Sequence, residues 1–212
     1  MATATATAPT VTIPAPNFKV AEFTIKGTAP YVQNAFSKKA REQMKAKQAA
    51  GSTGKKGTKK AAKDFDACYK EAQHVSHDGW HGIPAGAFRN AMISACRTVG
   101  FKMTLAKLSV FIEADGFDAN EGTPLVKITK GEPEYCEHSV RIQMTTDIRV
   151  RAMWREGWQA KLRVRFDADQ FTVEDVANLL NRVGAQVGIG EGRPDSKTSC
   201  GMGWGMFEIV NK

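Results

Sequence analysis

Hydrophobic and polar positions along this 212-residue chain follow two periods, and each period predicts one kind of element. Alternation at period two predicts strands at 19–26, 105–113, 125–129, 148–154, 159–166 and 206–210. Apolar residues spaced three and four positions apart predict helices at 64–74, 82–97 and 172–184. The last helix has Thr172 as N-cap and Gly184 at its end, so local signals mark both of its limits.

The strands at 148–154 and 159–166 are predicted to pair as a hairpin. Alternation places basic side chains on one face of each arm and Val, Leu and Phe side chains on the other. One face of the hairpin is therefore expected to be core and the other basic. The basic residues are Arg149 and Arg151 on the first arm and Lys161, Arg163 and Arg165 on the second.

Without its insertions, the predicted order is strand, helix, two strands, helix, strand. This is the βαββαβ order of a ferredoxin-like domain, an α+β fold that RNA-recognition motifs also use. We predict one such domain at 18–212, with a β insertion at 101–146 and a flexible basic segment at 38–63. Residues 1–17, with Ala-Thr repeats and three prolines, are predicted to form a mobile arm. The hairpin and the last strand lack base-stacking aromatic residues, which disfavours an ordinary RNA-recognition motif.

Positive charge is concentrated in one segment. The chain carries a net charge of +8, yet residues 38–63 alone hold nine lysines and Arg41 against a single acid, Glu42. That segment therefore carries +9, and the other 186 residues sum to −1. Ser37 is a candidate N-cap for a helix at its start. An excess of positive charge confined to one segment indicates that this segment faces a polyanion. The alternative is a solvated linker.

Composition also limits location and chemistry. The four cysteines form no C-x-x-C pair, so neither a zinc ribbon nor a thioredoxin-type site is available, and a reducing cytoplasm fits best. No apolar stretch approaches the ~18 residues that span a bilayer, and no signal peptide opens the chain. We expect a soluble cytoplasmic protein with no membrane contact, no metal and no cofactor.

Six glycines near the end of the chain form two triplets at alternate positions, 188, 190 and 192, then 201, 203 and 205. Between them lie Arg193 and Lys197. One interpretation is a strand with one bare face, approached closely by a ligand or by another backbone. The alternative is a set of plain turns. No P-loop or dinucleotide-binding glycine pattern is present, so an extended polyanion is the simplest ligand.

Two stretches resemble the RAMP superfamily, the RNA-binding subunits of CRISPR effector complexes and their relatives. They are the I-P-x-x-x-F-R-x-A pattern at 83–91 and the late glycine-rich loop before the last strand. The resemblance spans about 19–210 and is greatest to the backbone subunits that polymerise along guide RNA. A stand-alone, phage-encoded relative is an equally consistent identity. The resemblance implies that Arg89 and the loop at 188–197 contact the nucleic-acid backbone.

Two alternatives remain open. Some RAMP relatives are metal-independent ribonucleases that use a histidine, and His74, His77 and His81 precede the 83–91 pattern. Those histidines lack an evident orienting partner in the sequence, and a zinc site at His77 and His81 is not supported by their glycine-broken spacing. A purely structural assembly protein is the other alternative, and it leaves the lysine segment unexplained.

The sequence therefore predicts a nonenzymatic protein that binds single-stranded RNA or DNA without sequence preference and polymerises along it, alone or with other effector subunits. The predicted contacts are Lys38, Lys39, Arg41, Lys55, Lys56, Lys59, Lys60, Arg89, Arg149, Arg151, Lys161, Arg163, Gly190, Gly192, Arg193, Lys197, Gly201 and Gly203.

Overall fold

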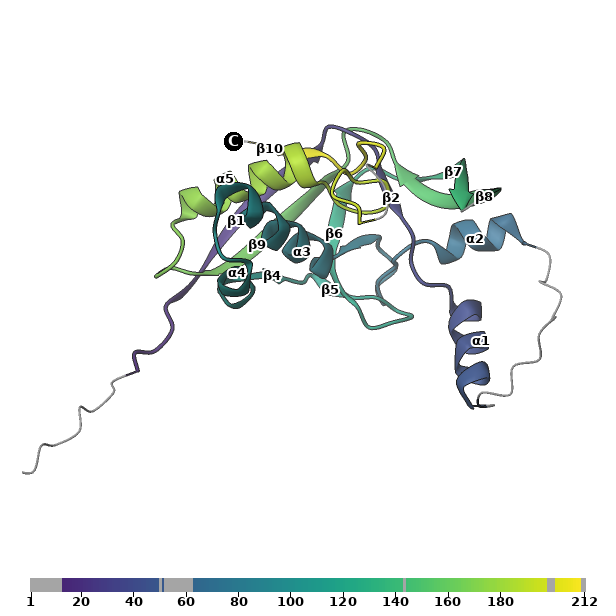
Figure 1. The fold of residues 1–212 in the computed structure, drawn as a ribbon, viewed down its shortest axis with the longest axis horizontal. Coiled ribbons are helices and arrows are strands. Elements are labelled where there is room, and N and C mark those ends of the chain that lie inside the picture. Colours follow the sequence, from purple (N-terminus) through teal and green to yellow (C-terminus); the bar gives the residue numbers. More distant parts are fainter. Residues whose placement is uncertain (1–12, 50, 52–62, 143, 198–200, 211–212) are drawn as a thin grey trace, which may run out of the picture.

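The structure, a computed structural model, describes residues 13–49, 51, 63–142, 144–197 and 201–210 (Figure 1). Residues 1–12 of the predicted arm and residues 50 and 52–62 of the predicted flexible segment lie outside these ranges. The fold is α+β and confirms the ferredoxin-like prediction. Its core elements in chain order are β1 (Phe18–Gly27), α3 (Ala85–Ala95), β4 (Val110–Glu113), β9 (Gln159–Asp167), α5 (Val173–Arg182) and β10 (Phe207–Ile209).

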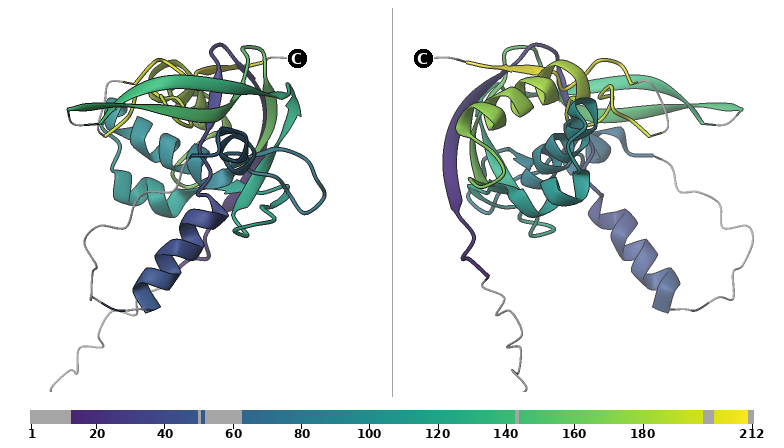
Figure 2. Two further views of the ribbon diagram at one scale, coloured as in Figure 1. Left: turned by 90° about the vertical axis from the view of Figure 1, so that its right-hand side faces the viewer. Right: turned by 60° about the vertical axis from the view of Figure 1, so that its left-hand side comes forward.

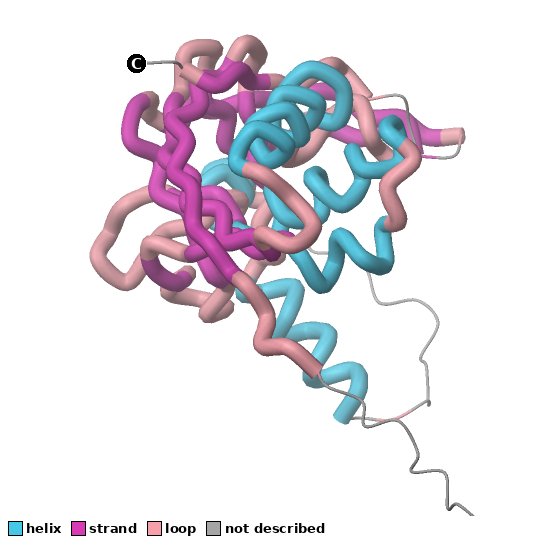
Figure 3. Tube along the Cα trace, turned by 90° about the vertical axis from the view of Figure 1, so that its left-hand side faces the viewer, coloured by secondary structure: helices cyan, strands magenta, loops and turns pink. Residues whose placement is uncertain are grey.

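The four core strands lie in the order β10, β1, β9, β4, and every neighbouring pair is antiparallel. This is the order in which two split βαβ units interleave. Both core helices lie on the same side of the strands (Figure 3). The predicted alternation in β9 is confirmed, since Ala160, Leu162, Val164 and Phe166 are buried while Lys161 and Arg165 are exposed.

The capping of α5 follows the predicted pattern. Thr172 Oγ1 accepts from the backbone N–H of Asp175 at 3.1 Å, and Asp175 Oδ2 accepts from the backbone N–H of Thr172 at 2.9 Å. The helix continues into a π turn, Val183–Val187. A Cβ on Gly184 would lie 1.9 Å from the carbonyl oxygen of Phe207, so glycine lets the turn pack directly on β10.

The predicted hairpin of 148–154 and 159–166 is wrong. Its first arm belongs to a second sheet of three strands, in the order β2 (Tyr31–Gln33), β8 (Thr145–Trp154), β7 (Pro133–Ile142). Residues 155–158, between the arms, carry the chain from one sheet to the other. Trp154, which precedes them, and Trp158, the last of them, are both buried. The strand that pairs with β8 along its length is β7. The second strand of the βαββαβ core is instead β4, which pairs with β9 and lies inside the 101–146 stretch predicted to be the insertion.

The remaining elements extend the two sheets or decorate them. Residues 105–109 are helical, contrary to the predicted strand at 105–113, because a short apolar run fits either element until its packing is known. The predicted helix at 82–97 begins only after Pro84, since residues 82–84 pair with β6 (Pro124–Lys130). The full set of these remaining elements is α1 (Lys38–Ala49), α2 (Phe65–Glu71), β3 (Gly82–Pro84), the 3₁₀ turn Cys96–Val99, α4 (Met103–Ser109), β5 (Gly116–Phe117) and β6 (Pro124–Lys130).

Two features extend away from the body. The helix α1 projects from it, and β7 and β8 reach beyond the main sheet (Figure 2). Ser37 begins α1 as predicted, with its Oγ accepting from the backbone N–H of Ala40 at 3.1 Å. None of the α1 side chains is buried. Within the described residues, no helix is both long enough and apolar enough to cross a bilayer.

Candidate functional site

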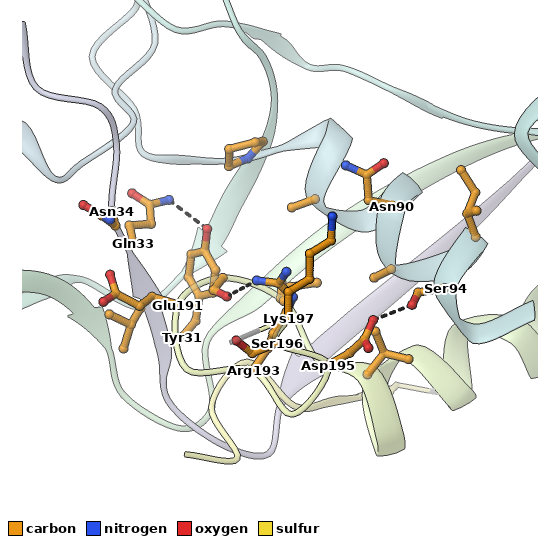
Figure 4. Close-up of a pocket in the computed structure, with 18 of the residues that line it drawn as sticks. Tyr31, Gln33, Asn34, Asn90, Ser94, Glu191, Arg193, Asp195, Ser196 and Lys197 are labelled. Atoms are coloured by element: carbon orange, nitrogen blue, oxygen red, sulfur yellow. Dashed lines mark hydrogen bonds between the residues drawn. The ribbon is translucent and has the colours of Figure 1, made fainter. Parts of the chain in front are cut away.

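A cavity of about 1050 Å³ lies between α3, β2 and the glycine loop, which we define as residues 188–197. Tyr31 and Gln33 form one wall, Asn90 and Ser94 of α3 form another, and Lys197 of the glycine loop extends between them (Figure 4). The cavity therefore joins three segments far apart in the sequence. The other lining residues are Val32, Asn34, His74, Pro84, Ala87, Ala91, Ile93, Arg97, Met103, Lys107, Arg149, Val187, Ile189, Gly190, Glu191, Arg193, Asp195 and Ser196.

All six glycines of the two triplets have positive φ, between 69° and 77°. The second triplet is accordingly a series of turns and not the predicted strand. The two triplets lie against each other: Met202 N–H donates to Gly192 O at 2.7 Å, and Ile189 N–H donates to Gly205 O at 3.1 Å. For most of the triplet glycines, the close neighbour is therefore this chain's own backbone. Gly203 differs, because a Cβ there would meet no atom within 4 Å.

Asp195 ties the glycine loop to α3. Its carboxylate accepts from the Ser94 hydroxyl and, at 2.8 Å, from the Arg97 guanidinium. The Ser94 hydrogen bond, followed by that of Arg97, holds the pKa of Asp195 below its usual value. Glu191 ties the other part of the loop to β8, with its carboxylate 2.5 Å from Arg151 Nε and 3.5 Å from Arg149 Nη1.

The cavity is positively charged in spite of these two acids. Its lining includes five cations, Arg97, Lys107, Arg149, Arg193 and Lys197, against Glu191 and Asp195, a formal excess of three. In the described part of the chain, no carboxylate lies within 4 Å of Lys107, Arg193 or Lys197. Arg193 Nη1 instead donates to Gly190 O at 3.0 Å, which holds its guanidinium against the loop. A concave surface with this charge attracts anions.

A buried polar network lies at the edge of the cavity, around His74. Its Nδ1 is 3.0 Å from Asp118 Oδ2, and both residues are buried. Asp118 Oδ1 is fixed by the backbone N–H groups of Asn120 and Glu121, each at 2.8 Å. The side chain of Gln33 accepts from His74 N–H at 3.0 Å. The expectation that this histidine lacks an orienting partner is therefore wrong, and the partner lies 44 residues away in the sequence.

The other two candidate histidines are not part of this network. His77 is exposed and His81 is half-buried with its ring 5.7 Å from the Trp154 ring, and neither lines the cavity. Burial lowers the pKa of His81, which favours its neutral form. Among the described residues, no group of three His, Cys, Asp or Glu side chains is placed to hold a metal ion.

Of the predicted contacts, the structure brings four to the cavity lining: Arg149, Gly190, Arg193 and Lys197. Arg89 lies outside it. Its Nε donates to Val110 O at 2.9 Å, a second donor reaches Lys107 O, and the guanidinium lies 4.9 Å from the centre of the Phe111 ring. Arg89 thus joins α3 to the end of α4 and the start of β4.

The basic residues of β9 face away from the cavity, on the open side of the main sheet. There, Lys161 pairs with Glu22 at 2.6 Å and Arg163 pairs with Asp115 at 2.9 Å. The charges of Lys161 and Arg163 are therefore balanced locally, whereas the Arg165 guanidinium lies over the rings of Phe18 and Phe111. On α1, Arg41 pairs with Glu121 at 2.8 Å, and Lys38 and Lys39 stand at the start of the helix. The predicted contacts Lys55, Lys56, Lys59 and Lys60 lie outside the described residues.

The sequence interpretation missed the acids and amides that organise this site. The sequence does not single out Glu191, Asp195 or Asp118, because each partners residues 40 to about 100 positions away. Gly192 and Gly201 shape the loop without lining the cavity. Only the position of Glu191 between two glycines of one triplet was a usable signal.

Comparison with known proteins places the fold. No family model matches the chain, and the search of curated proteins found no match. Among solved structures, 26 chains match. One belongs to the cryo-EM structure of the Type III-B Cmr-beta bound to cognate target RNA, with a TM-score of 0.52 and 7% identity. The match covers 92% of this chain and 60% of the other, so this chain spans about three fifths of that neighbour's length. At this identity the likeness shows the α+β, ferredoxin-like fold alone.

Proposed function

We propose that this protein binds single-stranded nucleic acid, RNA or DNA, along the cavity and without base preference. The observation that carries the proposal is the excess of three cations in a cavity of about 1050 Å³. Lysine and arginine contacts to phosphates supply affinity but read no sequence. Of Phe, Tyr and Trp residues, the described cavity lining holds Tyr31 alone. Tyr31 is 2% exposed and its hydroxyl accepts from Gln33, so it offers no open face for base stacking.

The fold neighbour supports RNA as the strand, because its structure contains a bound target RNA. At 7% identity this support concerns the fold and not the contacts. A single domain of this size covers a handful of nucleotides, on the order of the 4–16 of one small module. We therefore propose that copies polymerise along the strand, alone or with other effector subunits, because adjacent copies raise one another's effective concentration.

Electron microscopy of the protein on long single strands tests the assembly. We expect continuous coats, and discrete monomers at saturation would contradict the filament. Deleting residues 2–12, which belong to the proposed arm at 1–17, is expected to leave the melting temperature unchanged and to lower the cooperativity of binding. Unchanged cooperativity would remove the arm from the assembly.

Binding itself is tested by fluorescence anisotropy of labelled oligouridine and oligothymidine across a salt series. We expect Lys197→Gln to lower the salt slope by about 0.7, the value of one phosphate contact to a single strand. Lys161→Gln is the matched control, since it removes the same charge from a paired lysine on the open side of the sheet. Equal effects of the two substitutions would show that the cavity is not the binding surface.

A second function, RNA cleavage, is favoured by one observation, the His74–Asp118 pair beside the cavity. A carboxylate on Nδ1 leaves Nε2 as the basic nitrogen, which is the arrangement that a general base for a 2′-hydroxyl needs. The test is incubation of labelled RNA with wild type, His74→Ala and, as a control, the exposed His77→Ala. Cleavage that is lost only in His74→Ala, and absent on DNA, would establish this function. Intact RNA with bound wild type would exclude it.

A further inference from the structure

Three nitrogen-bearing groups converge on the carboxylate of Glu191. Arg151 Nε lies 2.5 Å from Oε2, while Arg149 Nη1 and His138 Nε2 lie 3.5 and 3.8 Å from Oε1. All three come from β7 and β8, whereas Glu191 comes from the glycine loop. The Arg151 and Glu191 side chains are only 14% and 20% exposed. The group is thus a half-buried anion site filled by an acid from another part of the chain.

The charges of this site do not balance. Both guanidiniums stay protonated at any physiological pH, so Glu191 neutralises at most one of the two. Burial lowers the pKa of His138, which leaves the imidazole mostly neutral and limits the excess to one positive charge. Half-buried arginines without a counter-charge are unfavourable. The carboxylate therefore satisfies the site when no other anion is present.

A backbone phosphate offers the same chemistry as the carboxylate. It carries one negative charge and two free oxygens, which match the fork of a guanidinium. The site is also within reach of the strand proposed above, because Arg149 and Glu191 both line the cavity.

The loop backbone at Glu191 is held by contacts that do not involve the Glu191 side chain. Glu191 N–H donates to Val32 O at 3.0 Å, and a Cβ on the preceding Gly190 would lie 2.6 Å from the same oxygen. The main chain at this point is wedged against β2. A rotation of the Glu191 side chain alone would free Arg149 and Arg151 without moving the loop.

We propose that Glu191 is a built-in substitute for phosphate, which holds Arg149 and Arg151 in position until a phosphate of the bound strand displaces it. The inference rests on the proposed function, because it names one phosphate subsite within that cavity. It makes Glu191 a residue that lowers affinity while keeping the empty site folded. A residue that merely tied the loop to β8 would have no such effect on binding.

The experiment compares the affinity for labelled 30-nucleotide oligouridine of wild type, Glu191→Gln, Glu191→Asp and Glu113→Gln. Glu191→Gln keeps the shape and removes the competing charge, so we expect binding about tenfold tighter and a salt slope steeper by about 0.7. Glu191→Asp withdraws the carboxylate by one methylene and should lie between. Glu113→Gln is the matched control, because it removes an acid that faces Arg163 at 3.5 Å on the open side of the sheet, and we expect little change.

Thermal unfolding of every variant identifies loss of fold, and Glu191→Asp remains informative should Glu191→Gln unfold. If wild type binds and neither Glu191 variant binds more tightly, Glu191 is only a tether and the inference is overturned while the proposed function stands. Equal tightening in Glu113→Gln would overturn it as well, since the effect would then be one of net charge. If wild type and all variants fail to bind, the proposed function and this inference fall together.

Discussion

Gly205→Ala and Gly203→Ala form a matched pair that tests how the glycine triplets work. Both residues have left-handed backbones, with φ of 71° and 74°, so alanine costs about 1–2 kcal/mol at either position. Their surroundings differ. A Cβ on Gly205 would lie 1.8 Å from Ile189 O, whereas a Cβ on Gly203 would meet nothing within 4 Å.

The contact at Gly205 adds a second cost. Relieving it requires the two glycine runs to separate by more than an ångström, which breaks the Ile189 N–H to Gly205 O hydrogen bond. Overpacking of this kind costs about 1–3 kcal/mol, and a lost hydrogen bond about 1 kcal/mol. We therefore expect Gly205→Ala to lower the free energy of unfolding by about 3–6 kcal/mol and Gly203→Ala by about 1–2 kcal/mol.

Urea denaturation and thermal melting measure the difference. For a chain of this length, 1 kcal/mol corresponds to about 2–4 °C, so the two melting temperatures should differ by several degrees at least. Equal destabilisation would refute the reasoning, because it would show that backbone strain alone accounts for these glycines. Gly203 is then the position at which a larger side chain tests ligand contact: Gly203→Val, compared with Gly203→Ala, is expected to weaken strand binding if the open space beside it holds the ligand.

Two further predictions concern residues that flank the cavity. Asp195 has a lowered pKa in the folded protein, so its stabilising effect is present above its ordinary pKa of 3.8 and is lost as the pH falls through the folded value. The melting temperature of Asp195→Asn should accordingly lie furthest below that of wild type at neutral pH and approach it below about pH 4, and a constant difference would contradict the assignment. Arg89→Gln removes two donors to backbone carbonyls and a contact with the Phe111 ring, so we expect a loss of about 1–3 kcal/mol in unfolding free energy with an unchanged salt slope. A slope lower by about 0.7 would instead support the nucleic-acid contact that the family resemblance implies.

Local signals predicted those elements whose limits are encoded within a few residues. The Thr172–Asp175 capping box and the alternation of β9 are examples, since each depends on neighbours in the chain. The pairing of β8 was not predictable in this way. Both arms of the supposed hairpin alternate correctly, and four residues between strands suit a hairpin as well as a crossing between sheets.

A long-range contact decides between those two possibilities. Trp158 Nε1 donates to Ala29 O at 3.0 Å, and a Cβ on Gly27 would lie 2.0 Å from the same nitrogen. The indole therefore lies against the end of β1, about 130 residues away in sequence. Such a contact depends on the tertiary fold, because the four residues between the strands include Trp158 but do not specify its partner.

The site shows the same division between local and distant information. Alternation correctly placed the basic residues of β8 and β9 on polar faces, but these faces belong to different sheets. The acids that face the basic residues of β9 belong to neighbouring strands. Glu22 of β1 lies opposite Arg163 in the register and pairs with Lys161, and Glu113 of β4 also lies opposite Arg163. Charge must therefore be counted over a surface and not along a strand.

That count sets a limit on the salt dependence of binding. The described cavity lining has three cations without a carboxylate within 4 Å, and each phosphate contact to a single strand contributes about 0.7 to the salt slope. Contacts by the cavity alone therefore predict a slope of about 2 for each bound protomer. The nine lysines at 38–63 would raise it well above this value if they also contact the strand. Replacing Lys55, Lys56, Lys59 and Lys60 with glutamine separates the two cases. A slope that starts well above 2 and falls by up to about 2.8, which is 0.7 for each lysine replaced, would assign these lysines to the strand. A slope that stays near 2 in both proteins would leave the cavity as the whole electrostatic contact.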